Sequence, residues 1–416
     1  MVKSKDNSVK TPNYYVRKRL MKNKPAIAGF IVIVLAHIIA ILGYLIMPDH
    51  TPNANDGSAL IKKKPIGFEC TLLKFVKNRE IEKVNFLEKM YMGQESEYII
   101  QPITSYHIKN LKVYYSLYGK GNQVESADIV VATKKLYVGA SSKLKPDSIY
   151  NYNVKDDIIT YLDLNENPVK ITKEELIRDF LDNNIEQRKY ILGTDKAGRD
   201  ILSRLLFGTR ISLSIGFISV LISILVGVTL GALSGFFGGA TDKFIMWLMT
   251  VVWSIPSIML VIAISLALQS RGVWVAFVAV GLTMWVEVAR VVRGQILSLK
   301  EKLYVEAAKA LGVGDFRIIF VHILPNIVGP LIVIATANFA SAILIEAGLS
   351  FLGLGVQPPM PSWGMMVNEG YSSMLAKDSG YLVVLPSVCI CVLVLAFNLF
   401  GNGLRDAYDP QSAVKW

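Results

Sequence analysis

Six long apolar runs constrain the fold of this chain more than any other feature of its sequence. The first holds about 22 residues without a formal charge, and a helix of that length, at roughly 1.5 Å per residue, crosses the hydrocarbon core of a bilayer. With 52% hydrophobic residues and a mean hydropathy of +0.41, the chain is also too apolar for a soluble protein of its length. The sequence predicts an all-α polytopic membrane protein with six transmembrane helices, at residues 26–47, 211–236, 244–268, 273–292, 324–344 and 381–399.

Basic residues are concentrated ahead of the first apolar run. Residues 1–25 contain eight Lys or Arg against one Asp, a net charge of 8 − 1 = +7. Because Lys and Arg accumulate on the cytoplasmic side of a membrane, we expect a cytoplasmic N-terminus and, after six crossings, a cytoplasmic tail at 405–416. The first run is too long for a signal peptide and no small-x-small cleavage site follows it, which favours an uncleaved anchor. Nucleic-acid binding is not favoured, since the basic stretch abuts an apolar run and has few aromatic residues for base stacking.

Residues 48–190 have the composition of a soluble domain, rich in Lys, Asn and Tyr. We expect an inserted extracytoplasmic α+β domain between the first and second transmembrane helices. Thr172 and Glu175 form the pattern of a capping box that opens a helix to about Gln187. Strands are predicted at 111–118, 127–138 and 158–164. The domain contains no grouping of carboxylates, His or Ser that favours an enzymatic role.

The sequence also lacks the usual signatures of catalytic and metal sites. Its three cysteines, Cys70, Cys389 and Cys391, form neither a disulfide framework nor a metal-ligand spacing. No Gly-x-x-x-x-Gly-Lys-Ser/Thr loop is present, so the chain has no phosphate-binding loop for ATP. We therefore expect a non-catalytic membrane subunit that binds no cofactor or metal.

A polar segment at 296–323 interrupts the apolar part of the chain. Residues 301–311 are rich in Ala, Lys, Glu and Leu, which are good helix formers, and Gly312 and Gly314 supply the backbone that ends such a helix. A second short helix is expected from Asp315 to Pro325. Ala307 and Ala308 would leave a smooth flank that a partner can approach closely. The alternative is an ordinary amphipathic loop helix.

This segment resembles a known motif. Glu306-Ala307-Ala308, then three residues, Gly312, nine residues and His322-x-Leu324-Pro325 are similar to the EAA loop in membrane subunits of binding-protein-dependent ABC importers. In that family the loop forms a coupling helix that docks in a groove of a cytoplasmic ATPase. The resemblance assigns ATPase coupling to Glu306, Ala307, Ala308, Gly312, His322 and Pro325. His322 departs from the general pattern, which has an aliphatic residue there, but His is usual in the peptide branch.

Two further motifs resemble the C-type permease of oligopeptide and dipeptide importers. One lies before the second apolar run and the other lies in the expected outer loop; their residues are Gly193, Thr194, Asp195, Gly198, Arg199, Asp200, Glu346, Gly348, Pro358, Pro359, Trp363 and Gly364. The insert of roughly 140 residues is much longer than the family's connector, so its role does not follow from the resemblance. The implied organisation is a basic N-terminus (1–25), a first transmembrane helix (26–47), the insert (48–190), a permease core (191–404) with its coupling loop (296–323), and a tail (405–416).

The resemblance implies a type I ABC importer in a bacterial plasma membrane, in which this chain forms half of the pathway for peptides, most simply oligopeptides. The implied partners are a second permease subunit, two ABC ATPases that bind ATP and magnesium, an extracytoplasmic solute-binding protein and the peptide itself. Import of nickel or another small solute is the near alternative. A membrane-anchored sensor that uses the insert is an alternative of a different class.

Charged residues inside the apolar runs need partners, because a charge at the bilayer centre costs about 2.5–3.5 kcal/mol. Glu287 and Arg290 lie three residues apart on one helix face, so we expect an internal ion pair, with substrate contact as the alternative. Glu346 would meet either the amino terminus of a peptide or a structural partner, a backbone amide or an arginine. Pro256 and Pro386 free backbone carbonyls, which would line a cavity or only bend the helix.

Overall fold

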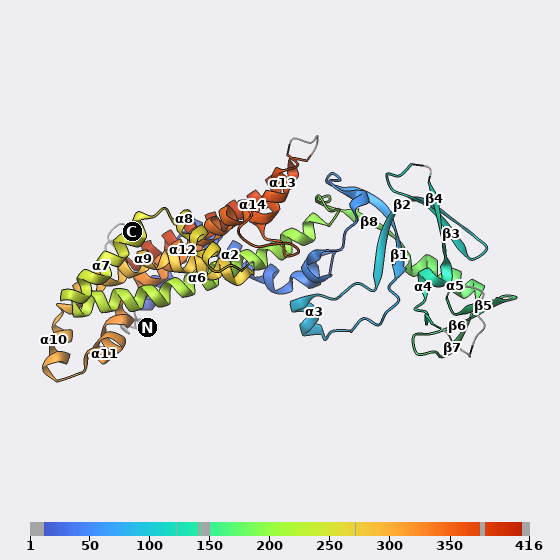
Figure 1. Ribbon diagram of the computed structural model, residues 1–416. Helices are drawn as coiled ribbons and strands as arrows, with labels where there is room; N and C mark the ends of the chain where they lie inside the picture. Colours follow the sequence, from blue (N-terminus) through green and yellow to red (C-terminus); the bar gives the residue numbers. More distant parts are fainter. Residues whose placement is uncertain are drawn as a thin grey trace, which may run out of the picture. The chain divides into compact units, whose positions relative to one another are not determined.

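The computed structural model describes residues 12–121, 123–139, 143, 150–270, 272–374 and 379–409. These residues divide into two compact units, which are described separately (Figure 1). The helical unit comprises the described residues within Met1–Ala40, Gly208–Tyr371 and Val383–Trp416, and the mixed unit comprises those within Ile41–Phe207 and Ser372–Leu382. Parts of the predicted N-terminus and tail, residues 1–11 and 410–416, lie outside the described residues.

Among the described residues, five helical stretches are long and apolar enough to cross a membrane, and a sixth crossing results if one bent pair counts as a span. They are α2 (Lys24–Ile46), α6 (Ile201–Phe237), α9 (Val273–Lys300), the stretch Asp315–Phe351 that ends in α12 (Val328–Phe351), and α14 (Tyr381–Tyr408). The chain is therefore a polytopic membrane protein, as predicted. A short helix, α1 (Pro12–Leu20), precedes α2.

The apolar run at 244–268, predicted as one crossing with Pro256 as a possible bend, forms two helices that meet at Pro256. α7 (Gly239–Ser254) and α8 (Ser257–Ala267) meet at an angle of 96°. Pro256 separates them because it has no backbone N–H and restricts the preceding residue, and Ile255 accordingly has extended dihedrals (φ −90°, ψ 129°). Pro386, in contrast, lies inside the continuous helix α14.

Small residues bring α6 and α9 into close contact. Gly227, Gly231 and Gly235 are spaced four apart, so they form one stripe along α6. A Cβ atom on Gly231 would lie 2.5 Å from the carbonyl oxygen of Ala289, and one on Gly227 would lie 2.5 Å from Cβ of Val288. Closely packed helices with small residues at the contact are typical of membrane bundles.

In its described residues, the mixed unit contains two antiparallel sheets and three complete α-helices besides the ends of α2 and α6. The larger sheet has the order β4-β3-β2-β1-β8, and the smaller has the order β5-β6-β7. The strands are β1 (Phe68–Val76), β2 (Tyr98–Lys109), β3 (Lys112–Leu117), β4 (Val124–Asp128), β5 (Tyr152–Lys155), β6 (Ile158–Leu162), β7 (Pro168–Thr172) and β8 (Ile185–Tyr190). The helices are α3 (Phe86–Met92), α4 (Ile129–Thr133) and α5 (Lys173–Asn183), and the core includes Leu73, Ile103, Val113, Ile159 and Phe180.

Of the secondary-structure predictions for this unit, two strands and the capping box are confirmed and one strand is wrong. Strands at 111–118 and 158–164 are confirmed as β3 and β6, and the capping box is confirmed, with Thr172 Oγ1 accepting from Glu175 N and Glu175 Oε2 accepting from Thr172 N, both at 3.2 Å. The strand at 127–138 is wrong: β4 ends at Asp128 and α4 follows. The adjacent residues Ile129 and Val130 are both buried, which a strand with one buried face does not allow.

Candidate functional site

The polar segment folds as helix, break, helix, as predicted. α10 (Leu303–Ala310) follows α9, Gly312 adopts φ +75°, and α11 (Asp315–Arg317) opens the second helical stretch. That stretch continues through single π and 3₁₀ turns at Ile318–Ile323 and Leu324–Ile327 into α12. The positive φ explains the glycine, because L residues rarely adopt that conformation.

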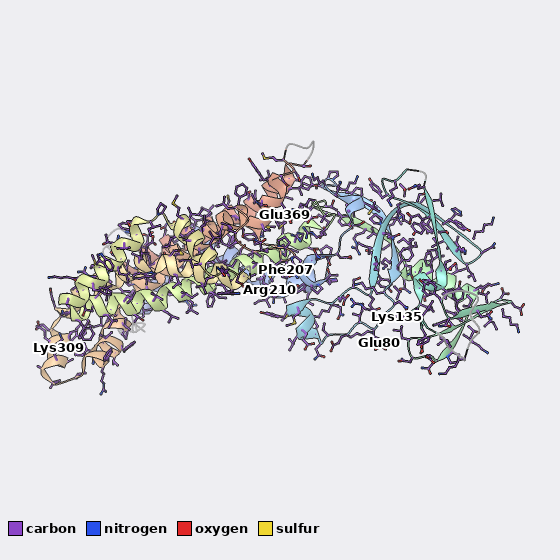
Figure 2. All side chains as sticks on the ribbon, viewed as in Figure 1. Glu80, Lys135, Phe207, Arg210, Lys309 and Glu369 are labelled. Carbon is purple, nitrogen blue, oxygen red and sulfur yellow. The ribbon has the colours of Figure 1, made fainter. Side chains whose placement is uncertain are left out.

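The coupling segment, residues 301–327, is held by a core of its own. Val305 and Ala308 of α10 pack with Ile318 and Ile323, and with residues of α6 and α9 that include Phe236 and Val292. Lys300 Nζ donates to the Phe236 carbonyl at 3.0 Å, and Lys309 Nζ lies 5.0 Å from the Phe236 ring centroid. Figure 2 labels Lys309 on this helix. A displacement of α10 therefore reaches α6 and α9 directly.

The predicted coupling residues do not all face outward. Glu306, Ala307, Gly312 and Pro325 are exposed and His322 is half-buried, but Ala308 is only 7% exposed and belongs to the segment's own core. The expected smooth flank therefore contains Ala307 without Ala308, because successive helix residues point 100° apart.

Sequence reasoning missed the apolar part of this surface. Leu303 and Leu311, at the two ends of α10, are each 83% exposed, and Phe316 of α11 is 64% exposed. Apolar side chains grouped around charged ones are typical of a protein-binding surface. The sequence could have indicated them, because each is a large apolar residue within an otherwise polar loop.

A charged group links three helices next to this segment. Asp242 of α7 accepts two hydrogen bonds from Arg293 of α9, from Nε at 2.6 Å and from Nη2 at 2.7 Å. Ser234 of α6 donates a third hydrogen bond to the same carboxylate. Bidentate charged pairs of this kind fix geometry as well as adding stability. The group joins α6, α7 and α9.

The first family-like motif forms a buried clamp in the mixed unit. Asp195 Oδ1 accepts from the backbone N–H groups of Ala197 (2.8 Å) and Arg199 (2.9 Å), while Oδ2 accepts from Arg199 Nε (2.6 Å) and lies 3.3 Å from Arg204 Nε. Lys64 N donates to Thr194 Oγ1 at 2.9 Å. We call residues 49–64 together with 192–204 the signature clamp.

The remaining clamp residues join the same two stretches of chain. Asp200 accepts from Ser203 N at 2.8 Å, and Asp49 N donates to Ser203 Oγ at 2.9 Å. Burial raises the pKa of the Asp200 carboxyl above its ordinary value, and the hydrogen bonds from Ser203 oppose that rise. Gly193 and Gly198 have φ of +80° and +77°, and a Cβ on either would collide with the backbone of 58–65. These residues hold the chain together rather than presenting a binding surface.

The clamp sits where the insert begins and ends. Gly67 N donates to the Tyr190 carbonyl at 3.1 Å, and Phe68 of β1 pairs with Tyr190 of β8. The segment that enters the two sheets at Phe68 and the segment that leaves them at Tyr190 are therefore neighbours beside the clamp.

The second family-like motif is also buried, in the helical unit. Glu346 is 1% exposed, and Ser350 Oγ donates to its Oε1 at 2.7 Å. Its partner is thus a hydroxyl group, not the backbone amide or arginine that we expected, and its burial leaves no surface for a peptide.

The other residues of this motif pack closely. A Cβ on Gly364 would lie 2.6 Å from Cα of Ala347, and the Trp363 ring lies against Gly208. Pro358–Pro359 is a cis peptide bond, and Gly348 lies beside Ile258.

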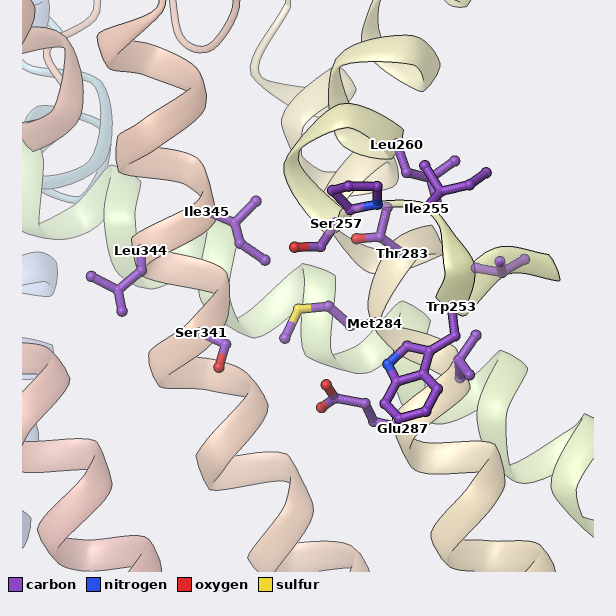
Figure 3. A pocket seen from close by; sticks show the side chains of 13 residues that line it. Trp253, Ile255, Ser257, Leu260, Thr283, Met284, Glu287, Ser341, Leu344 and Ile345 are labelled. Carbon is purple, nitrogen blue, oxygen red and sulfur yellow. The ribbon is translucent and has the colours of Figure 1, made fainter. Parts of the chain in front are cut away.

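A cleft opens at the break between α7 and α8. It has a volume of about 430 Å³ and is lined by residues of the break and by parts of α8, α9 and α12 (Figure 3). Glu287 lines it, but the predicted ion pair with Arg290 is absent among the described residues. Instead the Arg290 guanidinium lies 3.7 Å from the ring centroid of Trp253, near the end of α7.

Two family models match the chain. One, the binding-protein-dependent transport system inner membrane component, covers residues 227–413. The other, the N-terminal transmembrane domain of oligopeptide transport permease C, covers residues 11–65. The second match ends where β1 is about to begin, so both sheets lie outside the two matched regions.

Curated relatives agree with these matches. The glutathione transport system permease protein GsiD of Pectobacterium atrosepticum is 46% identical over 220 residues, which are 53% of this chain and 72% of the relative. The oligopeptide permease OppC of Bacillus subtilis is 41% identical over 53% of this chain and 71% of its own length. The di/tripeptide permease DppC of Pseudomonas aeruginosa is 43% identical over 54% of this chain and 73% of its own length. The chain therefore belongs to the inner-membrane permease family of binding-protein-dependent ABC importers, among relatives that serve peptide transport.

Proposed function

We propose that this chain is one of two unlike membrane subunits of an ATP-driven importer of peptides, and that it forms half of the translocation pathway. Its relatives carry the names of glutathione, oligopeptide and di/tripeptide transport systems. All of these named cargoes are peptides. The proposed partners are a second permease, two cytoplasmic ATPases that bind ATP and magnesium, and a solute-binding protein.

The coupling segment is the observation that carries this proposal. Its outer surface combines Glu306 and Ala307 with the exposed Leu303 and Leu311, a combination suited to a groove on another protein. Its inner surface packs on α6 and α9. A docked ATPase that moves α10 would therefore move these helices with it as a rigid body.

The orientation follows from the same segment. If ATPases dock on α10, this loop is cytoplasmic, and an alternation of six crossings places both termini in the cytoplasm and the sheets of the mixed unit outside. A solute-binding protein delivers cargo on that side. We propose that the sheets contact this protein or control its docking.

The direct test is Glu306→Arg in the complete transporter reconstituted in lipid. Peptide-dependent ATP hydrolysis should fall at least about tenfold, because a reversed charge inside an interface costs several kcal/mol. Glu174→Arg, at an exposed position on α5, is the matched control and should leave the rate unchanged. An unaltered rate for Glu306→Arg would reject the docking role, and activity without any ATPase would support a sensor instead.

A further inference from the structure

The cleft at the α7–α8 break has a lining that is suited to a cationic group. Of the residues that line it, Glu287 alone is charged, and the other polar side-chain groups are the hydroxyls of Ser257, Thr283 and Ser341 and the indole N–H of Trp253. In Figure 3 the Glu287 carboxylate points from α9 toward the helix that carries Ser341. The remaining walls are apolar.

Glu287 has no hydrogen bond or ion pair within the part of the chain that the structure describes, although it lies in an apolar helix and is exposed. A carboxylate at such a position is stable only next to water or a cation. The nearest cation along the helix, Arg290, lies against Trp253 instead. Glu287 is therefore available to a cation that comes from outside this chain.

We propose that Glu287 binds the α-ammonium group of a peptide while the peptide crosses the membrane. The negative carboxylate complements the positive ammonium group, and the three hydroxyls can form hydrogen bonds with the first peptide amide. The apolar wall can contact a side chain of the peptide. Broken transmembrane helices commonly form substrate sites in transporters. This proposal rests on the proposed function.

The test compares two cargoes in the reconstituted transporter with its solute-binding protein. Uptake of a peptide with a free amino terminus is measured beside uptake of its N-acetylated form, both chosen for measurable uptake by the unaltered complex. Glu287→Gln should lower kcat/KM for the free peptide about tenfold, equivalent to about 1.4 kcal/mol, and leave the acetylated form unchanged. Ser341→Ala, in the same cleft, should lower both equally and less.

Three outcomes would overturn the proposal. An equal loss for both peptides would show that Glu287 does not recognise the ammonium group. A loss of association with the second permease would show that a cation of that subunit neutralises Glu287. Unchanged uptake of both peptides would show that Glu287 does not contact cargo. If the unaltered complex transports neither peptide, the proposed function fails instead.

A separate observation in the mixed unit carries a second inference. α3 has no buried residue, and Phe86, Leu87, Tyr91 and Met92 are each at least 64% exposed. Four large apolar side chains in a seven-residue helix form a surface that water does not stabilise. We therefore expect lipid or another protein surface, rather than water, to contact this helix.

The position of α3, next to the end of α2, favours lipid over protein. A Cβ on Gly93, directly after the helix, would lie 2.7 Å from the Tyr44 ring, and Gln94 N donates to the His50 carbonyl at 3.0 Å. Tyr44 belongs to the last turn of α2, a helix apolar enough to cross a membrane that ends at Ile46. Because seven helical residues span about 10 Å, all of α3 lies within roughly that distance of the end of a transmembrane helix.

We infer that α3 lies in the interfacial layer of the lipid bilayer and anchors the mixed unit to it. Within the helix Glu88 and Lys89 cancel in charge. Insertion of apolar side chains, rather than attraction to anionic lipid, would therefore hold α3 at the membrane.

The experiment places a nitroxide label at position 87 of the complete transporter in phosphatidylcholine nanodiscs, using Leu87→Cys after replacement of the three native cysteines by Ser. Only labelled complexes that keep wild-type uptake are compared. Ile158→Cys, on a strand residue that is 48% exposed, is the control. Collisions with oxygen relative to a water-soluble nickel chelate should be several-fold more frequent at 87 than at 158. Equal ratios would reject lipid contact, and shielding of 87 from both reagents would show that a protein covers α3.

Discussion

Replacing Asp242 by Asn should weaken the junction of α6, α7 and α9 while leaving its shape nearly unchanged. The substitution removes the charge that receives two hydrogen bonds from Arg293 at 2.6 and 2.7 Å. Hydrogen bonds to charged groups contribute about 1.5–3 kcal/mol each. The two side chains keep 22% and 25% of their surface exposed, so solvent screens part of this energy, and the amide oxygen still accepts one bond. We expect a loss of about 2 kcal/mol in the free energy of unfolding.

A double-mutant cycle with Arg293→Gln measures the pair itself. The free energies of unfolding of the wild type, the two single variants and the double variant are determined by denaturant titration in a fixed lipid–detergent mixture. The coupling energy should be about 2 kcal/mol, because the residues are in direct contact. Glu301→Gln, which replaces an exposed carboxylate at the end of α9, should change stability by less than about 0.5 kcal/mol. A coupling energy below about 0.5 kcal/mol would refute the reasoning.

Three further predictions concern packing, the insert and a helix cap. Gly231→Leu should destabilise the helical unit by about 1–3 kcal/mol, since its side chain has no space against α9; an unchanged unfolding midpoint would contradict the packing of α6 on α9. Deleting residues 68–189 with a short Gly/Ser bridge should leave the complex assembled but lower peptide uptake, because Gly67 and Tyr190 are already adjacent; full uptake would dismiss a delivery role for the sheets. Thr172→Ala should cost about 1 kcal/mol through loss of the cap, while Thr172→Ser should retain stability in the same titration; equal losses would contradict the capping role.

Sequence alone predicted features that depend on neighbours along the chain. The apolar runs became helices because a backbone in hydrocarbon must satisfy its own hydrogen bonds. The capping box at Thr172 and the break at Gly312 were predictable for a similar reason, since each involves only a few consecutive residues. The Gly stripe of α6 was readable as well, but its partner helix was not.

The tertiary structure decided which groups meet across the fold. Arg290 of α9 contacts Trp253 of α7 instead of Glu287, a partner that the spacing of residues along one helix does not reveal. Ala308 faces inward because α10 packs on α9, and residues 129–133 form a helix because the core buries adjacent side chains. Hydropathy and spacing describe one segment at a time, whereas the partner of a charge or of a packed face depends on where distant segments come to lie. The sequence therefore determined a membrane permease with six apolar runs and a polar helix–break–helix segment, and the tertiary structure determined that Glu287 lines a cleft.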